Sequence, residues 1–442
     1  MDRGPLGILA CAGRLPIEIA EAATNTGRGV HLVGIAGFAE PGIAAYSHEF
    51  VNLGQIGGML SSLRGAGCRE LVIAGALRRP NLLKVRVDHG FFRAIGTVLR
   101  LTRGGDDSVL RRVVRFFESE GFVVVGVDKV APHLVAGIGA LGRIEPRAEH
   151  LRAISRASRL LRALGTFDVG QGAVGDGDRI VAIEGVRGTD AMLEQVRAWQ
   201  ADAAGGIGKD RDLGVAVLVK LPKPGQELRV DLPTIGPRTV ERAYACGLAG
   251  IVVAAGRALV LERAQMVAMA DTHGLFVVGI EDGSIASDVA KPDADVPPLL
   301  FRPLGWHRAK APERRDVALG ARVLAVLRDH DAGRAVVVVG EHVQGIDAGL
   351  GVGRLLSGLG RSSHWGLRVF KRRIGALVVD AIDDIGSDAA GIEATLERVR
   401  EAGLAGVAVI GESSATPRAA LLKEYAGRHR LFALVADVQG AT

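Results

Sequence analysis

Short apolar runs alternate with segments of helical periodicity along most of this 442-residue chain. In its first part, the apolar runs at residues 5–12, 30–36, 70–74 and 121–127 have the length of buried strands. Strands that alternate with helices form a mostly parallel sheet, which binds ligands at the carboxyl ends of its strands. The sequence therefore predicts an α/β protein that opens with an open, mostly parallel sheet domain.

The alternation continues with expected strands at residues 180–184, 213–219, 249–254 and 275–280. A chain of this length is expected to hold about two or three domains. A stretch with five prolines follows, at Pro292, Pro297, Pro298, Pro303 and Pro312. We predict four parts: an N-terminal α/β domain at 1–145, a catalytic α/β domain at 146–284, a Pro-rich linker at 285–315 and a further domain at 316–442.

The last part of the chain repeats the second part in diverged form. Residues 395–406 align without a gap to residues 239–250, and this offset of 156 holds through to Phe432 against Phe276. Because the offset is kept, we interpret residues 316–442 as a degenerate repeat of the catalytic domain. Chance similarity of two segments rich in alanine and glycine is the alternative.

A second match within the repeat aligns Glu341 with Glu184, over residues 341–348 and 184–191. The second domain contains a carboxylate, Asp231, whose role is considered below. In the copy, Asp383, Asp384 and Asp388 are the candidates for its equivalent.

Composition limits the classes of partner. The net charge of +6 favours anionic partners, such as phosphorylated substrates or an anionic membrane surface. No arginine-rich tail or aromatic-basic motif supports nucleic-acid binding. The three cysteines are far apart in sequence, which argues for a reducing compartment and against a zinc site. Residues 1–20 lack a secretory-signal pattern, and the longest apolar run, 246–261, is too short to span a bilayer. We expect a cytoplasmic protein that is at most peripheral on a membrane.

One loop combines the residue types of a phosphate site. Residues 220–236 read KLPKPGQELRVDLPTIG and follow the apolar run 213–219. Its prolines and glycines break both helix and strand. Such a loop at a strand end can arrange cations and a carboxylate around a phosphate group and a metal ion. A proline-stiffened surface loop with solvated charges is the alternative. The side chains in question are Lys220, Lys223, Gln226, Arg229 and Asp231.

Other candidate residues lie where strands end or helices begin. Gly13 lies in the turn between the first strand and the first helix, where backbone N–H groups form a natural anion site. Arg78 and Arg79 leave the third strand together, which suits phosphate binding, although a solvated basic turn explains them equally well. Helix capping is the alternative role for three more residues: Asp107, Thr189 and Asp190.

These segments together resemble a known family. Residues 220–236 look like the signature of the UDP-2,3-diacylglucosamine pyrophosphatases of lipid A biosynthesis, in the LpxI form that is unrelated to the calcineurin-like metallophosphatases. The resemblance extends from Gly7 to about Asp282, and nothing after about residue 300 belongs to the family pattern. The other matching segments keep the family order: GILACAGRLP at 7–16, GQIG at 54–57, GGDD at 104–107, DVGQG at 168–172 and EGVRGTD at 184–190.

The resemblance implies hydrolysis of the pyrophosphate bond of UDP-2,3-diacylglucosamine to UMP and 2,3-diacylglucosamine 1-phosphate (lipid X). It implies Mg²⁺ or another divalent cation, with Asp231 as the metal ligand or as the residue that activates water. Lys220 and Lys223 complete the expected catalytic set. Residues expected to bind substrate come from both matched parts: Gly13, Gly75, Arg78, Arg79, Asp107, Gln171, Thr189, Asp190, Gln226, Arg229 and Thr234.

The expected partners are the acylated UDP-sugar substrate, an inner-membrane surface and a second copy of the chain, with no nucleic acid. A cleft between the first two domains would hold the substrate. A nucleotide-sugar binding or sensing protein with a regulatory C-terminal domain is the alternative function. The repeat lacks the KPGQ and DLPTIG segments, so we interpret it as non-catalytic and expect residues 1–293 to fold and retain hydrolysis. Membrane association through the basic segment 368–373, dimer contacts and structural support are its candidate roles.

Overall fold

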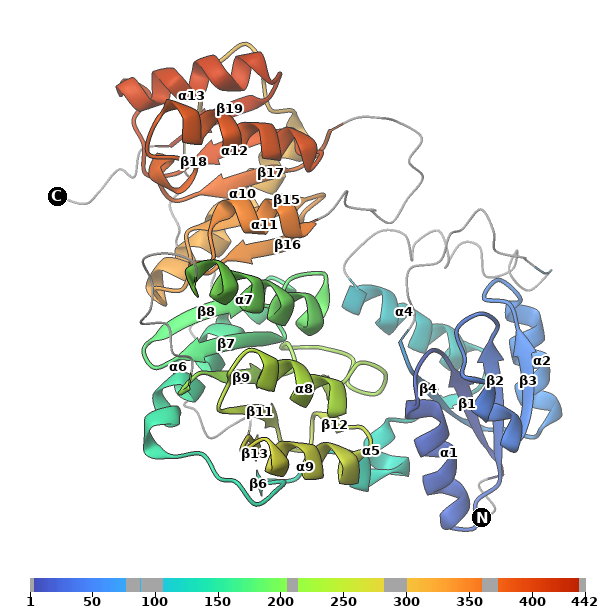
Figure 1. Cartoon of the computed structure of the whole chain (residues 1–442). Helices are drawn as coiled ribbons and strands as arrows, with labels where there is room; N and C mark the ends of the chain where they lie inside the picture. Colours follow the sequence, from blue (N-terminus) through green and yellow to red (C-terminus); the bar gives the residue numbers. More distant parts are fainter. Residues whose placement is uncertain are drawn as a thin grey trace. The chain divides into compact units, whose positions relative to one another are not determined.

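Figure 1 shows the protein as a computed structural model, which describes residues 4–76, 88, 106–204, 214–281, 300–359 and 373–436. Its contacts divide the chain into two compact units. Unit 1 comprises Met1–Gly137, Gly225–Gly236 and Ala255–Met266, and unit 2 comprises Ile138–Pro224, Pro237–Ala254 and Val267–Thr442. Two short segments from the second part of the chain thus belong to unit 1. The predicted four-part division assigns these two segments to the second domain, and it stays a prediction.

Unit 1 is built on a parallel sheet with the strand order β3-β2-β1-β4-β5. The central strand β1 is buried along its whole length, as its continuous apolar sequence predicts. This confirms the open parallel sheet expected at the N-terminus. The strands are β1 (Leu6–Ala10), β2 (Val30–Ile35), β3 (Ser47–Val51), β4 (Glu70–Ala74) and β5 (Val123–Val124). The helices are α1 (Leu15–Asn25), α2 (Ile56–Gly65), α4 (Asp106–Ser119) and α5 (Val127–Val130), with the 3-10 turns η1 (Pro41–Ala45) and η3 (Pro132–Leu134).

The edge strand β3 was not predicted, because it has no apolar run: four of its five residues are exposed. Residues 91–101, whose sequence also predicts a helix, lie outside the described residues.

The two returning segments of unit 1 pair with each other and with the N-terminal part. Strand β10 (Thr234–Ile235) runs parallel to β12 (Leu259–Val260). Leu259 is 3% exposed and packs in the cluster that holds β1 and α1. Backbone bonds join Ala136 to Ala258 at 2.9 Å, and the Glu18 carboxylate accepts from the Glu262 amide at 3.3 and 3.4 Å. The segments are therefore part of the fold of unit 1.

Unit 2 contains two six-stranded sheets. The first has the order β6-β13-β11-β9-β7-β8, and the second has the order β14-β19-β18-β17-β15-β16. The first sheet and its helices are β6 (Gly139–Ala140), α6 (Ala148–Gly165), β7 (Gly172–Asp176), β8 (Arg179–Ile183), α7 (Gly188–Ala204), β9 (Val217–Lys220), α8 (Pro237–Ala245), β11 (Gly250–Ala254), α9 (Arg263–Thr272) and β13 (Phe276–Ile280). The second sheet and its helices are β14 (Arg302–Pro303), α10 (Ala311–Asp329), β15 (Ala335–Val339), β16 (His342–Asp347), α11 (Val352–Leu359), β17 (Ala376–Val379), η4 (Ile382–Asp384), α12 (Ala389–Glu401), β18 (Gly406–Val409), α13 (Pro417–Arg428) and β19 (Phe432–Val435).

The two sheets of unit 2 have the same topology. In each, three parallel strands are flanked on one side by an antiparallel hairpin and on the other by a short antiparallel strand. The hairpins β7-β8 and β15-β16 also share a register shift, between Val174 and Gly175 in one and between Val337 and Val338 in the other. This is the arrangement expected of a repeat with a common fold.

Strand pairing gives the correspondence between the two sheets. Gly250 pairs with Phe276 as Gly406 pairs with Phe432, which confirms the offset of 156 for β11 with β18 and for β13 with β19. For β9 and β17 the offset is 159, because Val217 pairs with Gly250 as Ala376 pairs with Gly406. In the hairpins, Val174 pairs with Ala182 as Val337 pairs with Gly345, so the offset there is 163.

The predicted match of Glu341 to Glu184 is therefore wrong by six residues. The hairpin offset of 163 puts Asp347 in the place of Glu184, while Glu341 lies in the hairpin turn with a φ of 64°. Motif letters alone allowed the slip, because register is set by which residues pair across the hairpin.

Two elements of unit 2 depart from the sequence prediction for local reasons. Strand β7 was not predicted, because its sequence GAVGD has two glycines and few apolar residues. Helix α10 begins at Ala311, inside the predicted linker, because Pro312 is compatible with the first turn of a helix. Pro303 lies in the short edge strand β14, where a missing N–H is tolerated.

One hydrophobic cluster extends through both halves of unit 2. It contains Leu164 and Val219 from the half with the first sheet, and Leu327 and Val338 from the half with the second sheet. All four side chains are fully buried. The second sheet therefore shares a core with the first. Within the part of the chain that the structure describes, no helix has the length and apolar character needed to cross a membrane.

If the two sheets are equivalent, Gly250→Ala and Gly406→Ala should destabilise the protein by similar amounts. A Cβ at Gly250 would lie 2.4 Å from the Phe276 ring, and one at Gly406 would lie 2.4 Å from the Phe432 ring. Both rings are buried, so each substitution should cost about 1–3 kcal/mol. The urea midpoint of unfolding measures the effect.

The control is Gly427→Ala in α13, where a Cβ would meet nothing within 4 Å. It should leave the midpoint unchanged or raise it, since alanine favours helix. Tolerance of either test substitution to the same degree as this control would contradict the equivalence.

Candidate functional site

Two glycines shape the carboxyl edge of the unit 1 sheet. Gly13 follows β1 with a φ of 93°, and Gly75 follows β4 with a φ of 95°. Ala12 and Ala76 exchange backbone hydrogen bonds of 3.0 and 2.9 Å, which hold the two turns together. A Cβ at Gly75 would lie 2.6 Å from the Ala12 carbonyl oxygen, whereas one at Gly13 would meet nothing within 4 Å. The predicted pair of glycines is thus brought together, with open space beside Gly13.

The neighbouring predicted residues are only partly described. Arg78 and Arg79 lie outside the described residues. Asp107 is the second residue of α4, in its first turn. Thr234 opens β10, and its hydroxyl donates to the Leu232 carbonyl at 3.0 Å.

Asp231 lies in a short turn of unit 1. The Val230 and Asp231 amides both donate to the Glu227 carbonyl, at 3.1 and 3.0 Å. The Gln226 side chain, which is 8% exposed, donates from Nε2 to Asp231 Oδ2 at 2.5 Å. Val230 packs against the cluster that includes Phe117 and Phe122. The predicted carboxylate and amide are therefore neighbours, and Gln226 fixes the orientation of the carboxylate.

Arg229 is held by two carboxylates. Its guanidinium bonds both oxygens of Glu227 at 2.8 Å and Glu118 Oε1 of α4 at 2.7 Å. The hydrogen bonds that Arg229 donates to Glu227 raise the pKa of Arg229 and lower the pKa of Glu227. Arg229 was predicted to bind phosphate directly. Its observed contacts instead suit a residue that fastens the Asp231 turn to α4.

In unit 2, three strand ends bring Lys220 near a carboxylate that the sequence-based list omitted. Lys220 ends β9, is 7% exposed and pairs with Gly172 at the start of β7. The Glu184 amide donates to the Gly172 carbonyl at 2.8 Å. A Cβ at Gly172 would lie 2.4 Å from Glu184 Oε2, so this carboxylate lies over the glycine. The sequence analysis named Glu184 only as part of a motif. Strand pairing shows that it lies close to Gly172, the residue that pairs with Lys220.

The segment after Lys220 is tied to the turn at residues 168–172. Lys223 Nζ donates to Asp168 Oδ1 at 2.9 Å and to the Asp168 carbonyl at 3.1 Å. The Leu221 amide donates to the Gln171 carbonyl at 2.9 Å. Asp168 has a φ of 58°, which is uncommon for a residue other than glycine. Two predicted residues are thus placed on the same turn, Lys223 through Asp168 and Gln171 through the Leu221 amide.

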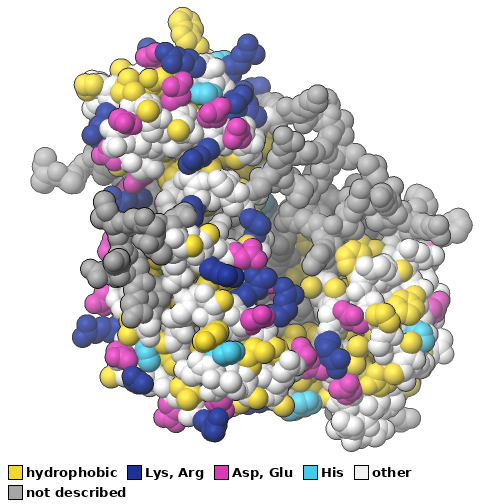
Figure 2. Space-filling view, in the orientation of Figure 1, with side chains coloured by type: hydrophobic (Ala, Val, Ile, Leu, Met, Phe, Trp, Pro, Cys, Tyr) yellow, Lys and Arg dark blue, Asp and Glu magenta, His cyan; other side chains and the backbone are white. Residues whose placement is uncertain are grey.

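Thr189 and Asp190 begin α7 but have partners other than the helix end. Thr189 Oγ1 donates to Glu184 Oε2 at 2.8 Å. Asp190 accepts from Arg238 at 3.0 Å and pairs with Arg242 at 3.4 Å, both on α8. Figure 2 shows Lys and Arg side chains gathered beside acidic ones over α7 and α8. Thr189 therefore belongs with Glu184, and Asp190 joins two helices.

Among the described residues, the predicted loop offers a divalent cation a single carboxylate rather than a cluster of ligands. No group of three or more His, Cys, Asp and Glu side chains that could hold a metal ion occurs in the described part of the chain. The carboxylates of the predicted loop are Asp231 and Glu227, and Glu227 is bonded to Arg229. A single carboxylate suits Mg²⁺, which is commonly held by one or two carboxylates together with substrate phosphates and water.

Comparison with known families matches the segments that carry these residues. Residues 5–134 match the LpxI N-terminal domain, and residues 137–278 match the LpxI C-terminal domain. The chain belongs to the LpxI family. A similar protein is the UDP-2,3-diacylglucosamine pyrophosphatase LpxI of Caulobacter vibrioides, which is 39% identical over 276 residues. The match covers 62% of this LpxI chain and 97% of the relative. The matched domains end within β13, before the second sheet.

In this LpxI chain, Arg229→Lys should loosen the Asp231 turn. Lysine keeps the charge but cannot bond both oxygens of Glu227 and Glu118 at once. Because Arg229 is 39% exposed, we expect a modest effect: about fivefold faster hydrogen exchange at the Val230 and Asp231 amides.

Exchange measured by mass spectrometry checks this against Arg64→Lys, which alters a more exposed pair with Glu120 in the same unit. Equal exchange at residues 225–236 in both variants would contradict the positioning role of Arg229.

Proposed function

We propose that this LpxI chain hydrolyses the pyrophosphate bond of UDP-2,3-diacylglucosamine and releases UMP and 2,3-diacylglucosamine 1-phosphate (lipid X). The observation that carries the proposal is the match over nearly the whole length of a relative with that pyrophosphatase name. The segment from Lys220 to Gly236 supports it, because this one stretch of sequence contains the cations Lys220 and Lys223 and the carboxylate Asp231.

In the proposed reaction, one P–O bond to the bridging oxygen breaks and one P–O bond to water forms. The bridging oxygen leaves on one phosphate, and the proton of water is released. Lys220 and Lys223 would offset the charge that builds up on the phosphoryl oxygens. Asp231, oriented by Gln226, would accept the proton of water or hold a cation. Arg229 would position the Asp231 turn through Glu118 and Glu227.

We further propose that the reaction requires Mg²⁺ or another divalent cation, held by Asp231 together with substrate oxygens. The cation would neutralise phosphate charge when bound. The residues proposed for the site belong to both units. A cleft between the first two domains therefore stays a prediction. Because the proposed substrate carries acyl chains, we propose that the protein is cytoplasmic and works at the inner-membrane surface. That the protein forms a homo-oligomer stays an expectation.

The direct test is phosphorus NMR of UDP-2,3-diacylglucosamine incubated with the purified chain, with Mg²⁺ and with EDTA. New signals of UMP and of a sugar 1-phosphate, in the Mg²⁺ sample alone, are expected. Binding of the substrate without turnover would favour the alternative, a nucleotide-sugar binding or sensing protein.

Asp231→Asn should preserve the fold and lower kcat by about 100- to 10,000-fold, because the neutral amide does not accept the proton and holds a cation more weakly than a carboxylate does. Product formation at saturating Mg²⁺ measures the effect, and circular dichroism checks the fold. Asp178→Asn is the control, since Asp178 is an exposed carboxylate in the β7-β8 turn. Hydrolysis by Asp231→Asn at the rate of this control would remove Asp231 from the mechanism.

Lys220→Met should lower kcat/KM by about 10- to 150-fold, through the loss of a charge-assisted phosphate contact. Methionine fits the buried end of β9 with little change in volume. The matched control is Lys129→Met, at a lysine that is 77% exposed. If both variants keep the same kcat/KM, Lys220 is a structural residue of the sheet.

A further inference from the structure

The two halves of unit 2 meet through equivalent elements. Each sheet order ends in the outer strand of its hairpin, β8 in one half and β16 in the other. These strands contact each other, as do α6 with α10 and α7 with α11. Under the hairpin offset of 163, β8 corresponds to β16, α6 to α10 and α7 to α11. Each element therefore packs against its own equivalent in the other half, as in a dimer with two-fold symmetry.

Arginines of both long helices reach across this interface. Arg322 of α10 lies over the Phe167 ring that follows α6, at 5.4 Å from its centroid. The equivalent residues in the other half are Arg159 and His330, and burial followed by the Arg159 charge lowers the pKa of His330. Arg156, one turn before Arg159, donates to the His330 carbonyl at 2.6 Å. An arginine of each first helix thus reaches the end of the other, which is the signature of an isologous interface.

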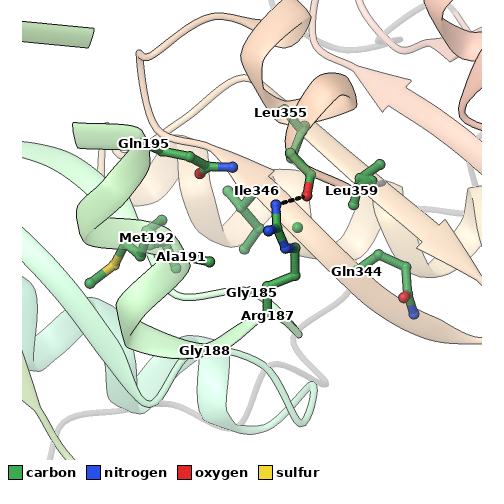
Figure 3. Close-up of a pocket in the computed structure, with 13 residues that line it drawn as sticks. Gly185, Arg187, Gly188, Ala191, Met192, Gln195, Gln344, Ile346, Leu355 and Leu359 are labelled. Atoms are coloured by element: carbon green, nitrogen blue, oxygen red, sulfur yellow. Dashed lines mark hydrogen bonds between the residues drawn. The ribbon is translucent and has the colours of Figure 1, made fainter. Parts of the chain in front are cut away.

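One contact joins two positions that are equivalent to each other. Gln195 of α7 corresponds to Gly358 of α11, and a Cβ at Gly358 would lie 2.0 Å from Gln195 Nε2. Only a position on a two-fold axis meets its own equivalent. Gly358 also makes room for Gln195, and Arg187 donates to the Gly358 carbonyl. Figure 3 shows Gln195 and Arg187 directed toward α11 in the pocket between the halves.

The end of β8 is in close contact with β16. The Val186 amide donates to the Gln344 carbonyl at 3.3 Å. A Cβ at Gly185 would lie 2.8 Å from that carbonyl oxygen and 3.3 Å from the Cα of Gly345. Because an outer strand otherwise presents unpaired backbone groups, this contact covers an edge that would remain open.

We propose that residues 300–436 act as a built-in second subunit. The face of the first half formed by β8, α6 and α7 is a protein interface whose occupant is a copy of the same fold, and in this chain the occupant is supplied in cis. The shared hydrophobic cluster and the arginine contacts from both sides would hold the two halves together after the chain between them is cut.

The test uses the full chain with a protease site inserted between Glu281 and Leu300, so that the folded protein can be cut. After cutting, native mass spectrometry and gel filtration at micromolar concentration should find the two fragments as a one-to-one complex. Gly185→Val should weaken this complex by at least about tenfold, because the added carbons meet backbone of the other half. Gly427→Val, at a position with nothing within 4 Å, is the matched control.

A swap tests the two-fold relation itself. Gly358→Gln should weaken the cut complex, because it places two glutamines at one point. The double variant Gln195→Gly with Gly358→Gln should restore it, since the pair is only exchanged across the axis. Separation of the unmodified fragments, or a Gly185→Val complex as tight as that of Gly427→Val, would overturn the built-in subunit. A double variant no tighter than Gly358→Gln would overturn the two-fold arrangement.

Discussion

The sheet that carries Lys220 depends on apolar packing that it shares with the second sheet of unit 2. Strand β9 is buried at every residue, so it needs packing partners on both faces. The cluster around it continues from Leu164 and Val219 to Leu327 and Val338 of the second half. Protein interiors are close-packed, so a core of this kind cannot be divided without leaving exposed apolar surface or voids. The C-terminal repeat is therefore part of the structure that supports the site, although it lacks the site's own loop.

The loop that begins at Lys220 shows how local order is achieved in a segment with few backbone pairings. It changes units between Pro224 and Gly225, where Gly225 takes a φ of 75°. On the unit 2 side, Lys223 is anchored by Asp168. On the unit 1 side, Gln226 orients Asp231 and Arg229 ties the turn to α4. These polar contacts hold charges in place before any ligand binds, which is the preorganisation that the proposed hydrolysis would require.

The prediction from continuous apolar runs was close for some strands, whereas residues 121–127 form only the two-residue strand β5. Strand β4 has the bounds expected for it, and β11 differs from expectation by one residue, because buried parallel strands are apolar at every position. Strands without such a run, β3 and β7, were missed. The site followed the same division. Residues of one loop, such as Gln226 and Asp231, were grouped correctly, whereas Glu184 was not assigned a role because its neighbours come from other strands.

The sequence alone determined the α/β class, the family and the presence of a second copy of the fold, because apolar periodicity, motif order and a constant offset are properties of the chain itself. Only the tertiary structure decided the register of that copy, since pairing across the β15-β16 hairpin assigns Asp347 to the place of Glu184. It also decided that Arg229 is bound by Glu118, a residue more than a hundred positions away in the chain. Contacts of this range depend on which surfaces pack together, and neither composition nor local periodicity carries that information.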